Sequence, residues 1–254
     1  MKMLVVVAHP DDETFGTGSV IARAAQQGAE VVVCCATHGE LGEPRAGSVP
    51  EGVTLAEVRA GELRDAAAVL GATRVRLLDF GDSGWDGDCN SRSLVGAAFD
   101  DVVAVVRNVV ADERPDVVVT LDPSGGDGHR DQVRIAQATT VAFDEAAPEG
   151  ATLYYWCLVR SVMRQWAAHN RGSVYDAVPE DDFGCPDELI TTVVDVADLL
   201  PLRLEAISRH RSQASPYDDL PADLQAAFLA TDRLIRARPA WVKSPVESEL
   251  TVPG

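Results

Sequence analysis

The sequence lacks any apolar run long enough to cross a membrane, and it lacks the features of a signal peptide. Met1 and Lys2 lead directly into the first apolar segment. We therefore expect a cytoplasmic protein that has no membrane partner.

Basic residues are scarce. The 22 Lys and Arg residues face 40 Asp and Glu residues, which gives a formal net charge of −18. Binding to nucleic acid or to an anionic membrane requires basic patches, so this balance excludes both as expected partners. A small-molecule partner is the remaining expectation, and the composition is compatible with a homo-oligomer.

Cysteine is also sparse and forms no C-x-x-C motif. The odd total of five fits reduced thiols better than a disulfide framework. Cys34 and Cys35 lie inside an apolar run, where thiols are most often core packing.

The chain does contain alternating apolar segments of strand and helix type. With 254 residues and 46% hydrophobic residues it can bury the core of one α/β domain. Predicted strands at 3–8, 30–36, 75–78 and 116–121 alternate with predicted helices at 17–27, 55–70 and 94–111 and with a helix that follows the stretch 122–132 and runs to about residue 146. This order predicts a Rossmann-like, doubly wound, mostly parallel sheet. Gly16 and Gly18 resemble part of a dinucleotide fingerprint, but the third glycine is absent, so we discount it.

Beyond residue 150 the alternation weakens. We predict strands at 153–159 and 190–196 and helices at 199–211 and 222–237. The segment 160–190, with an acidic turn at 180–182, is predicted to contribute to a cap. The expected organisation is one domain, 1–254, with a core at 1–150 and a C-terminal cap with helices at 151–254.

The end of the first strand concentrates ionisable residues. Pro10 ends the strand and is followed by Asp11 and Asp12, with His9 before it. An imidazole and a carboxylate at i and i+3 can reach one divalent metal, which leaves Asp11 free. The alternative is a solvated turn with a carboxylate at a helix start.

Three other loops follow predicted strands, at 37–42, 79–85 and 122–132. The carboxyl ends of parallel strands lie on one edge of a sheet, so these loops should meet the 9–13 turn. They would bring His129 and Asp131 to the first turn, in a cluster that suits a borderline divalent metal. Asp131 is placed to orient the imidazole of His129.

At this point the sequence resembles the PIG-L/LmbE-like family of zinc-dependent N-deacetylases. The resemblance rests on five motifs in the same order, at Ala8–Glu13, Thr37–Gly42, Arg59–Leu63, Asp82–Gly84 and His210–Gln213, together with a histidine element at His129. It implies a metal-dependent hydrolase that removes an N-acyl group, usually acetyl, from an amino-sugar-containing small molecule.

The resemblance also implies roles for individual residues. His9 and Asp12 would bind Zn²⁺, and Asp11 would act as general base. His129 would act as general acid or as an electrostatic stabiliser, with Asp131 tuning it. The residues implied to contact substrate are Arg59, Asp82, Glu40 and Asp127.

One position departs from the family. Where the family usually has a third zinc-binding histidine, this chain has Gln132. Either Gln132 binds through its oxygen, or Asp127 or His38 substitutes for it, or the metal site is weak or lost. An amide oxygen is a harder ligand than imidazole, so another divalent metal is also open.

Other residues have plainer interpretations. Arg59 and Glu62 at i, i+3 also fit a helix-surface ion pair. His169 is expected at the surface, and His210 is expected to brace a helix end. Trp85 either lines the substrate mouth or packs. The competing function is a non-catalytic small-molecule-binding protein that has lost its metal.

Overall fold

A seven-stranded sheet forms the centre of the molecule. The computed structural model describes residues 1–124, 126–170, 184–241 and 245–250. The strand order is β3-β2-β1-β4-β5-β7-β6. The strands are β1 (Lys2–Val7), β2 (Glu30–Cys35), β3 (Arg74–Leu77), β4 (Val117–Leu121), β5 (Thr152–Trp156), β6 (Thr192–Asp195) and β7 (Thr231–Arg238).

Strands β1 to β5 are parallel, and β7 runs antiparallel to both β5 and β6. The predicted Rossmann-like, mostly parallel sheet is confirmed. The run Met3–Val7 is completely or almost completely buried, because β1 has a neighbour on each side and helices over both faces.

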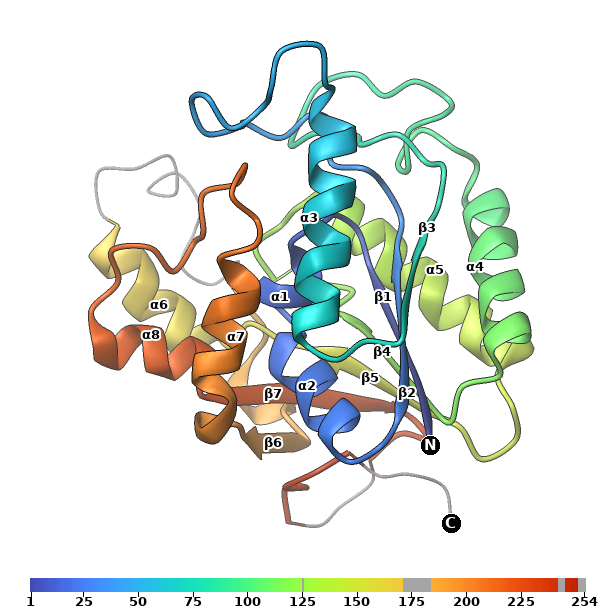
Figure 1. Ribbon diagram of the computed structural model, residues 1–254. Coiled ribbons are helices and arrows are strands. Elements are labelled where there is room, and N and C mark those ends of the chain that lie inside the picture. Colours follow the sequence, from blue (N-terminus) through green and yellow to red (C-terminus); the bar gives the residue numbers. More distant parts are fainter. Residues whose placement is uncertain (125, 171–183, 242–244, 251–254) are drawn as a thin grey trace.

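Helices cover both faces of this sheet (Figure 1). One face of β1 packs with α2 (Gly18–Gln26), α3 (Leu55–Val69) and α7 (Leu200–Ile207). The other packs with α4 (Phe99–Glu113) and α5 (Arg130–Ala146). A third apolar cluster joins α6 (Arg160–His169), α7 and α8 (Ala222–Leu229) beside the sheet. The other elements of the described residues are α1 (Asp12–Phe15) and the short 3-10 helices η3 (Asp187–Leu189) and η4 (Ala197–Leu199).

The largest sequence-based error lies in the segment 222–237. We predicted one helix, but α8 ends at Leu229 and β7 begins at Thr231. Asp232 and Leu234 are buried at alternate positions of β7, which is the period of a strand. Because β7 pairs with β5 and β6, β-sheet pairing outweighs the local helical pattern.

Two helix boundaries also differ. The helix predicted from residue 94 begins at Phe99, because Ser93 bonds to Asn90 and pairs with Gly81 in an isolated bridge. The helix predicted at 199–211 ends at Ile207, and His210 lies in the turn that follows. The predicted acidic turn at 180–182 lies outside the described residues.

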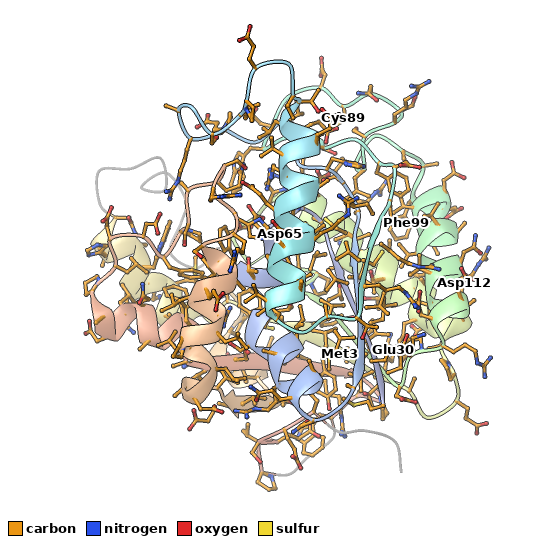
Figure 2. The ribbon with its side chains drawn as sticks, in the orientation of Figure 1. Met3, Glu30, Asp65, Cys89, Phe99 and Asp112 are labelled. Carbon is orange, nitrogen blue, oxygen red and sulfur yellow. The ribbon has the colours of Figure 1, made fainter. Side chains whose placement is uncertain are left out.

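The amino and carboxyl ends of the parallel strands lie at opposite sides of the molecule. Figure 2 shows Met3 and Glu30 near the amino ends of the central strands, and Cys89 on a loop beyond the carboxyl ends. Within the described ranges no helix is long and apolar enough to cross a membrane. The carboxyl edge carries the loops that the sequence singled out.

Candidate active site

The turn after β1 is held by its own carboxylates. Asp12 Oδ2 accepts hydrogen bonds from the backbone N–H groups of Ala8, at 3.1 Å, and His9, at 2.9 Å. The backbone of Asp11 has φ = 124°, a region that residues other than glycine rarely adopt. The turn is thus a strained, buried structure, and not the solvated turn of the alternative interpretation.

Two side chains hold Asp11 in this conformation. Its N–H donates to Glu13 Oε2 at 2.9 Å, and Arg59 Nη2 donates to its Oδ2 at 2.9 Å. Arg59 also donates to the carbonyls of Pro10 and Gly39. Gly39 has φ = 64°, and a Cβ there would overlap the Arg59 guanidinium. Arg59 is therefore a buried brace of the turn, and not a helix-surface partner of Glu62.

A further ion pair lies behind the turn. His210 Nε2 lies 2.6 Å from Glu13 Oε1, and both side chains are fully buried. Glu62 instead accepts hydrogen bonds from the N–H and hydroxyl of Ser212. His210, which follows α7, thus braces Glu13, and Glu13 in turn holds the backbone of Asp11. We had expected His210 to brace a helix end.

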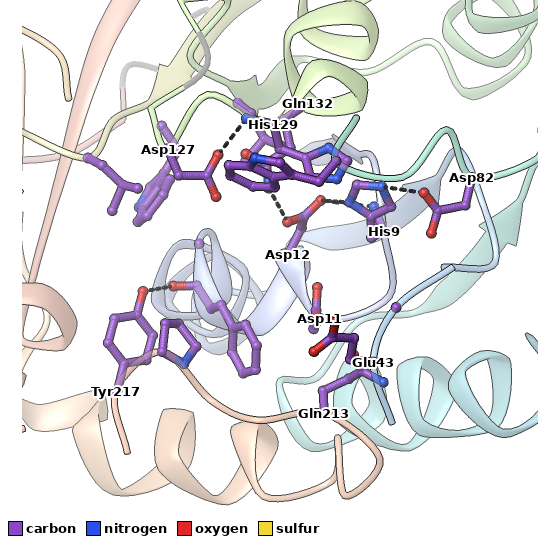
Figure 3. Close-up of a pocket in the computed structure, with 18 of the residues that line it drawn as sticks. His9, Asp11, Asp12, Glu43, Asp82, Asp127, His129, Gln132, Gln213 and Tyr217 are labelled. Atoms are coloured by element: carbon purple, nitrogen blue, oxygen red, sulfur yellow. Dashed lines mark hydrogen bonds and ion pairs between the residues drawn. The ribbon is translucent and has the colours of Figure 1, made fainter. Parts of the chain in front are cut away.

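The two nitrogens of His9 face different partners. Nε2 lies 3.2 Å from Asp131 Oδ2. Nε2 also lies 3.6 Å from Asp82 Oδ1, whereas Nδ1 lies 3.7 Å from Asp12 Oδ2 (Figure 3). Burial lowers the pKa of His9, but these hydrogen bonds and carboxylates outweigh it and raise the pKa to about 10.

Asp131 contacts a different histidine from the one expected. Its carboxylate reaches His9 and the N–H of Ser83, and only its backbone N–H contacts His129 Nδ1, at 3.2 Å. The expectation that the Asp131 side chain orients His129 is wrong for this geometry. The cause is that His129 is the N-cap residue of α5, so its ring bends back over the first helical turn.

His129 itself lies between two rings. Its centroid is 4.5 Å from that of His9 and 5.1 Å from that of Trp85. The backbone N–H of His129 donates a hydrogen bond to Asp127 Oδ1 at 2.9 Å. Burial and the charge of His9 lower its pKa to about 4. The ring is therefore neutral, and since Nδ1 accepts a hydrogen bond, its proton is on Nε2.

Gln132 points toward the predicted metal site. Its Nε2 donates to Asp12 Oδ1 at 2.9 Å. Amide oxygen and nitrogen positions are interchangeable by rotation, so the same pose can present the oxygen. His38, one of the proposed substitutes, lies against a different cavity.

A cavity of about 570 Å³ opens over these residues. Its polar part is lined by His9, Asp11, Asp12, Arg59, Asp82, Asp127, His129, Gln132 and Gln213. Its apolar part is lined by Phe15, Leu121, Trp156, Leu158, Met163, Trp166, Tyr217 and Phe228. Trp85, 53% exposed, stands at the rim, in agreement with a place at the mouth.

The structure does not bring Glu40 to this cavity. Glu40 is exposed, accepts a hydrogen bond from the N–H of Asp82 at 2.9 Å, and lines the second cavity with His38. The sequence in turn missed the apolar wall from α6, α8 and Tyr217. The only available signal was their helical apolar spacing, which is equally typical of plain core packing.

The polar part carries excess negative charge. Burial raises the pKa of Asp12 to about 7 and also raises the pKa values of Asp11 and Asp127. Arg59 and His9 are the cations that face these carboxylates, and they are fewer than the carboxylates, which suits a divalent metal ion. The residues present therefore fit a metal.

Two ligand sets are compatible with the geometry. His9, His129 and Asp131 have ligand atoms within 4.8 Å of one another. However, Asp131 is fully buried and does not line the cavity, whereas His9, Asp12 and Gln132 all do. A metal held by the second set would be accessible to water and substrate, with Asp131 on the far nitrogen of His9 as a supporting carboxylate.

Fold and site together define an LmbE-like α/β protein with a His/carboxylate centre at the carboxyl edge of its sheet. The chain belongs to the family described as PIG-L: GlcNAc-PI de-N-acetylase, whose model matches residues 4–143.

A relative agrees with this membership, and solved structures share the fold. The chain is 34% identical to the 1D-myo-inositol 2-acetamido-2-deoxy-alpha-D-glucopyranoside deacetylase of Rhodococcus jostii (strain RHA1), over 94% of this chain and 92% of the relative. It superposes on the N,N'-diacetylchitobiose deacetylase from Pyrococcus horikoshii with a TM-score of 0.56, at 20% identity, over 88% of this chain and 72% of that one.

A third neighbour has a different activity. GalB, the 4-carboxy-2-hydroxymuconate hydratase from Pseudomonas putida KT2440, matches with a TM-score of 0.63, at 19% identity, over 96% of this chain and 99% of that one. Likeness at this level shows the fold alone. The reaction has to be argued from the site.

Proposed function

We propose that this protein is a metal-dependent N-deacetylase that hydrolyses the acetamide of an amino-sugar-containing small molecule. The observation that carries the proposal is Asp11, a half-buried carboxylate that lines the cavity beside Asp12 and is held by Arg59 and Glu13. A pocket that only binds sugar has no need for a strained, braced carboxylate at this point. The curated relatives named as deacetylases of an acetamido-glucopyranoside of inositol support the substrate class.

We assign the metal ligands as His9, Asp12 and Gln132, with Zn²⁺ as the ion. When bound, the ion supplies Lewis acidity and makes a nearby water molecule more acidic. Asp131 accepts a hydrogen bond from His9 Nε2–H and so keeps Nδ1 available as the ligand atom.

Asp11 takes the proton of the attacking water and returns it to the leaving nitrogen, as a general base and then a general acid. His129 donates its Nε2 proton in a hydrogen bond to the developing oxyanion, because its neutral ring carries no other proton. Arg59 holds the Asp11 carboxylate, and Glu13 holds the backbone N–H of Asp11. Asp82, Asp127 and Trp85 contact the sugar, and the aromatic rings of the cavity wall suit stacking on sugar faces.

The direct test is acetate and free-amine release from the N-acetylglucosaminyl derivative of myo-inositol by zinc-loaded protein. We expect turnover that a chelator abolishes and that added Zn²⁺ restores. If the loaded protein released neither product from this compound nor from simpler N-acetylglucosaminides, the deacetylase proposal would be wrong.

Metal analysis separates the competing binding-protein function. Zinc-supplemented protein should retain a divalent ion that Asp12→Ala loses and Asp131→Asn largely keeps. If no ion is retained at His9 and Asp12 while the sugar still binds, the chain is a binding protein.

A further inference from the structure

A second group of metal-type donors lies behind the wall of the active-site cavity. It consists of Asp122, Cys157 and Cys185, which we call the thiol cluster. Their ligand atoms all lie within 4.8 Å of one another. The three residues are 7%, 4% and 2% exposed, so the cluster is shielded from solvent.

The sheet brings these residues together from three distant segments. Leu121 of β4 pairs with Trp156 of β5, which places the next residues, Asp122 and Cys157, side by side. Cys185 joins them through the backbone: its N–H donates to the carbonyl of Leu158 at 2.7 Å and its carbonyl accepts from Arg160 at 2.9 Å. The cluster is therefore fixed by backbone hydrogen bonds.

The carboxylate in this cluster lacks a cation. Asp122 accepts hydrogen bonds from the N–H and hydroxyl of Ser124, at 2.9 and 2.7 Å. Among the residues that the structure describes, no Lys, Arg or His forms an ion pair with it. A buried carboxylate without a cation is costly, and its neighbours here are two thiols.

The thiols are themselves weakly satisfied. Cys157 Sγ lies 3.5 Å from the carbonyl oxygen of Tyr155, and Cys185 Sγ lies 3.5 Å from that of Pro186. Both contacts are long and local, and Cys157 also forms a side-chain hydrogen bond with Cys185, so the two sulfur atoms already face each other beside Asp122. Two sulfur donors and one carboxylate oxygen thus lie together, and no described cation pairs with the carboxylate.

We propose that Asp122, Cys157 and Cys185 bind a second, structural Zn²⁺ ion, separate from the proposed active-site metal. Tetrahedral zinc with sulfur and oxygen ligands places neighbouring donors about 3.5–3.8 Å apart, which side-chain rotation within this cluster can reach. Zn²⁺ replaces the two S–H protons, so each ion bound releases two protons and forms two Zn–S bonds and one Zn–O bond. A water molecule completes the tetrahedron.

This ion would fasten the active-site loop to the sheet. The segment that begins at Asp122 continues to Asp127 and His129, and Gly126 accepts a hydrogen bond from the N–H of Gly184, beside Cys185, at 3.0 Å. An ion at the thiol cluster would join this segment to the end of β5. It would stabilise the position of His129 without touching substrate.

Cobalt is the sharpest probe, because Co²⁺ bound by thiolates has a sulfur-to-metal charge-transfer band in the near ultraviolet. The active-site donors contain no sulfur, so they cannot produce this band. Metal-free full-length protein titrated with Co²⁺ should develop the band, with two protons released per ion at this site. Asp12→Ala should keep the band, and so should Cys89→Ser, the matched control, since Cys89 lies on a loop outside the thiol cluster.

Cys157→Ser and Cys185→Ser should each lose most of the band. If a serine variant does not fold, Asp122→Asn serves instead and should weaken cobalt binding at this band by about tenfold or more. An absent band in the wild type, or a band unchanged in Asp122→Asn, would overturn the proposal.

Thiol counting tests the disulfide alternative. Protein unfolded without reductant should show all five cysteines as free thiols after the metal is removed. A count of three, five minus one bonded pair, would mean that Cys157 and Cys185 form a disulfide and would also overturn the proposal. Neither result depends on turnover, so the deacetylase proposal can fail or hold separately.

Discussion

Two buried ionic clusters lie at opposite ends of β1, and they handle charge in opposite ways. At the amino end, the Glu113 side chain is 1% exposed but ion-pairs with Lys2, at 2.8 Å, with Arg76, at 2.9 Å, and with Arg74. At the carboxyl end, Asp12 is buried and Asp127 half-buried beside further carboxylates, and neither has a Lys or Arg partner among the described residues.

The pKa values follow this difference. Burial tends to raise the pKa of Glu113, but hydrogen bonds from Lys2 and Arg74 outweigh it and lower the pKa. For Asp12 burial prevails, and the pKa rises to about 7. The amino-end cluster is balanced within the chain and serves stability, whereas the carboxyl-end cluster needs an external cation and serves chemistry.

The largest expected effect is on catalysis. Asp11→Asn should lower kcat by about 10²–10⁴-fold, because it removes the proposed general base. Metal content should stay nearly unchanged, since Asp11 is not assigned as a ligand. Asp65→Asn, an exposed position on α3 (Figure 2), is the matched control and should have native activity. Near-native turnover by Asp11→Asn would contradict the role of Asp11 as general base.

The balanced cluster should respond in stability and not in activity. Glu113→Gln should lower the free energy of unfolding by about 1–2 kcal/mol, because three partly exposed cations lose a charged acceptor. Denaturant unfolding at pH 7 measures the effect, and Asp112→Asn on the same helix, with its exposed side chain, is the control. A loss of turnover without a loss of stability would contradict the structural assignment.

The two clusters should also differ in pH dependence. The folded-state pKa of Glu113 is lowered, so its stabilisation is fully present above its unfolded pKa of about 4.3 and is lost as pH falls through the folded value. The difference in stability between wild type and Glu113→Gln should therefore shrink below about pH 4.

Asp12 should behave in the opposite sense in chelated protein. Its pKa is raised to about 7, so its ionisation destabilises the metal-free fold progressively from about pH 4 to pH 7. Asp12→Asn should flatten the decrease in stability across this window. If the slope of stability against pH were the same in both proteins, the metal-free site would not carry the excess negative charge that we infer.

The smallest of these effects concerns zinc affinity. Gln132→His should raise it by about tenfold or more, because imidazole is a better zinc ligand than an amide oxygen and the position already faces Asp12. Zinc titration of the two proteins against a competing chelator measures the change. Equal affinities would place residue 132 outside the coordination sphere.

The sequence predicted those features that depend on residues close together in the chain. The apolar run before His9 predicted a central parallel strand, and Pro10 marked the point where the polar turn begins. The direction of Gln132 followed from its place at the start of α5. In these segments burial and backbone restrictions act on neighbouring residues, which the sequence displays directly.

Contacts between distant residues were not predictable in the same way. Glu13 and His210 are 197 positions apart, and Asp131 reaches His9 across 122 positions. Nothing in the spacing of His129 and Asp131 indicated that the carboxylate would turn to another ring. The segment 231–238 was misassigned for the same reason, because its strand exists only through pairing with β5 and β6.

The position of β7 has a consequence for biosynthesis. Among the described strands β6 pairs with β7 alone, although β7 is made later and lies between β5 and β6. While the ribosome is still adding the last part of the chain, the edge of β5 remains unpaired on that side. Such an edge is a template for wrong strand pairing, so the nascent chain is exposed to aggregation until residues 231–238 emerge. Truncation before β7 should therefore yield an insoluble product, even though the five parallel strands and the turn at His9 are already complete.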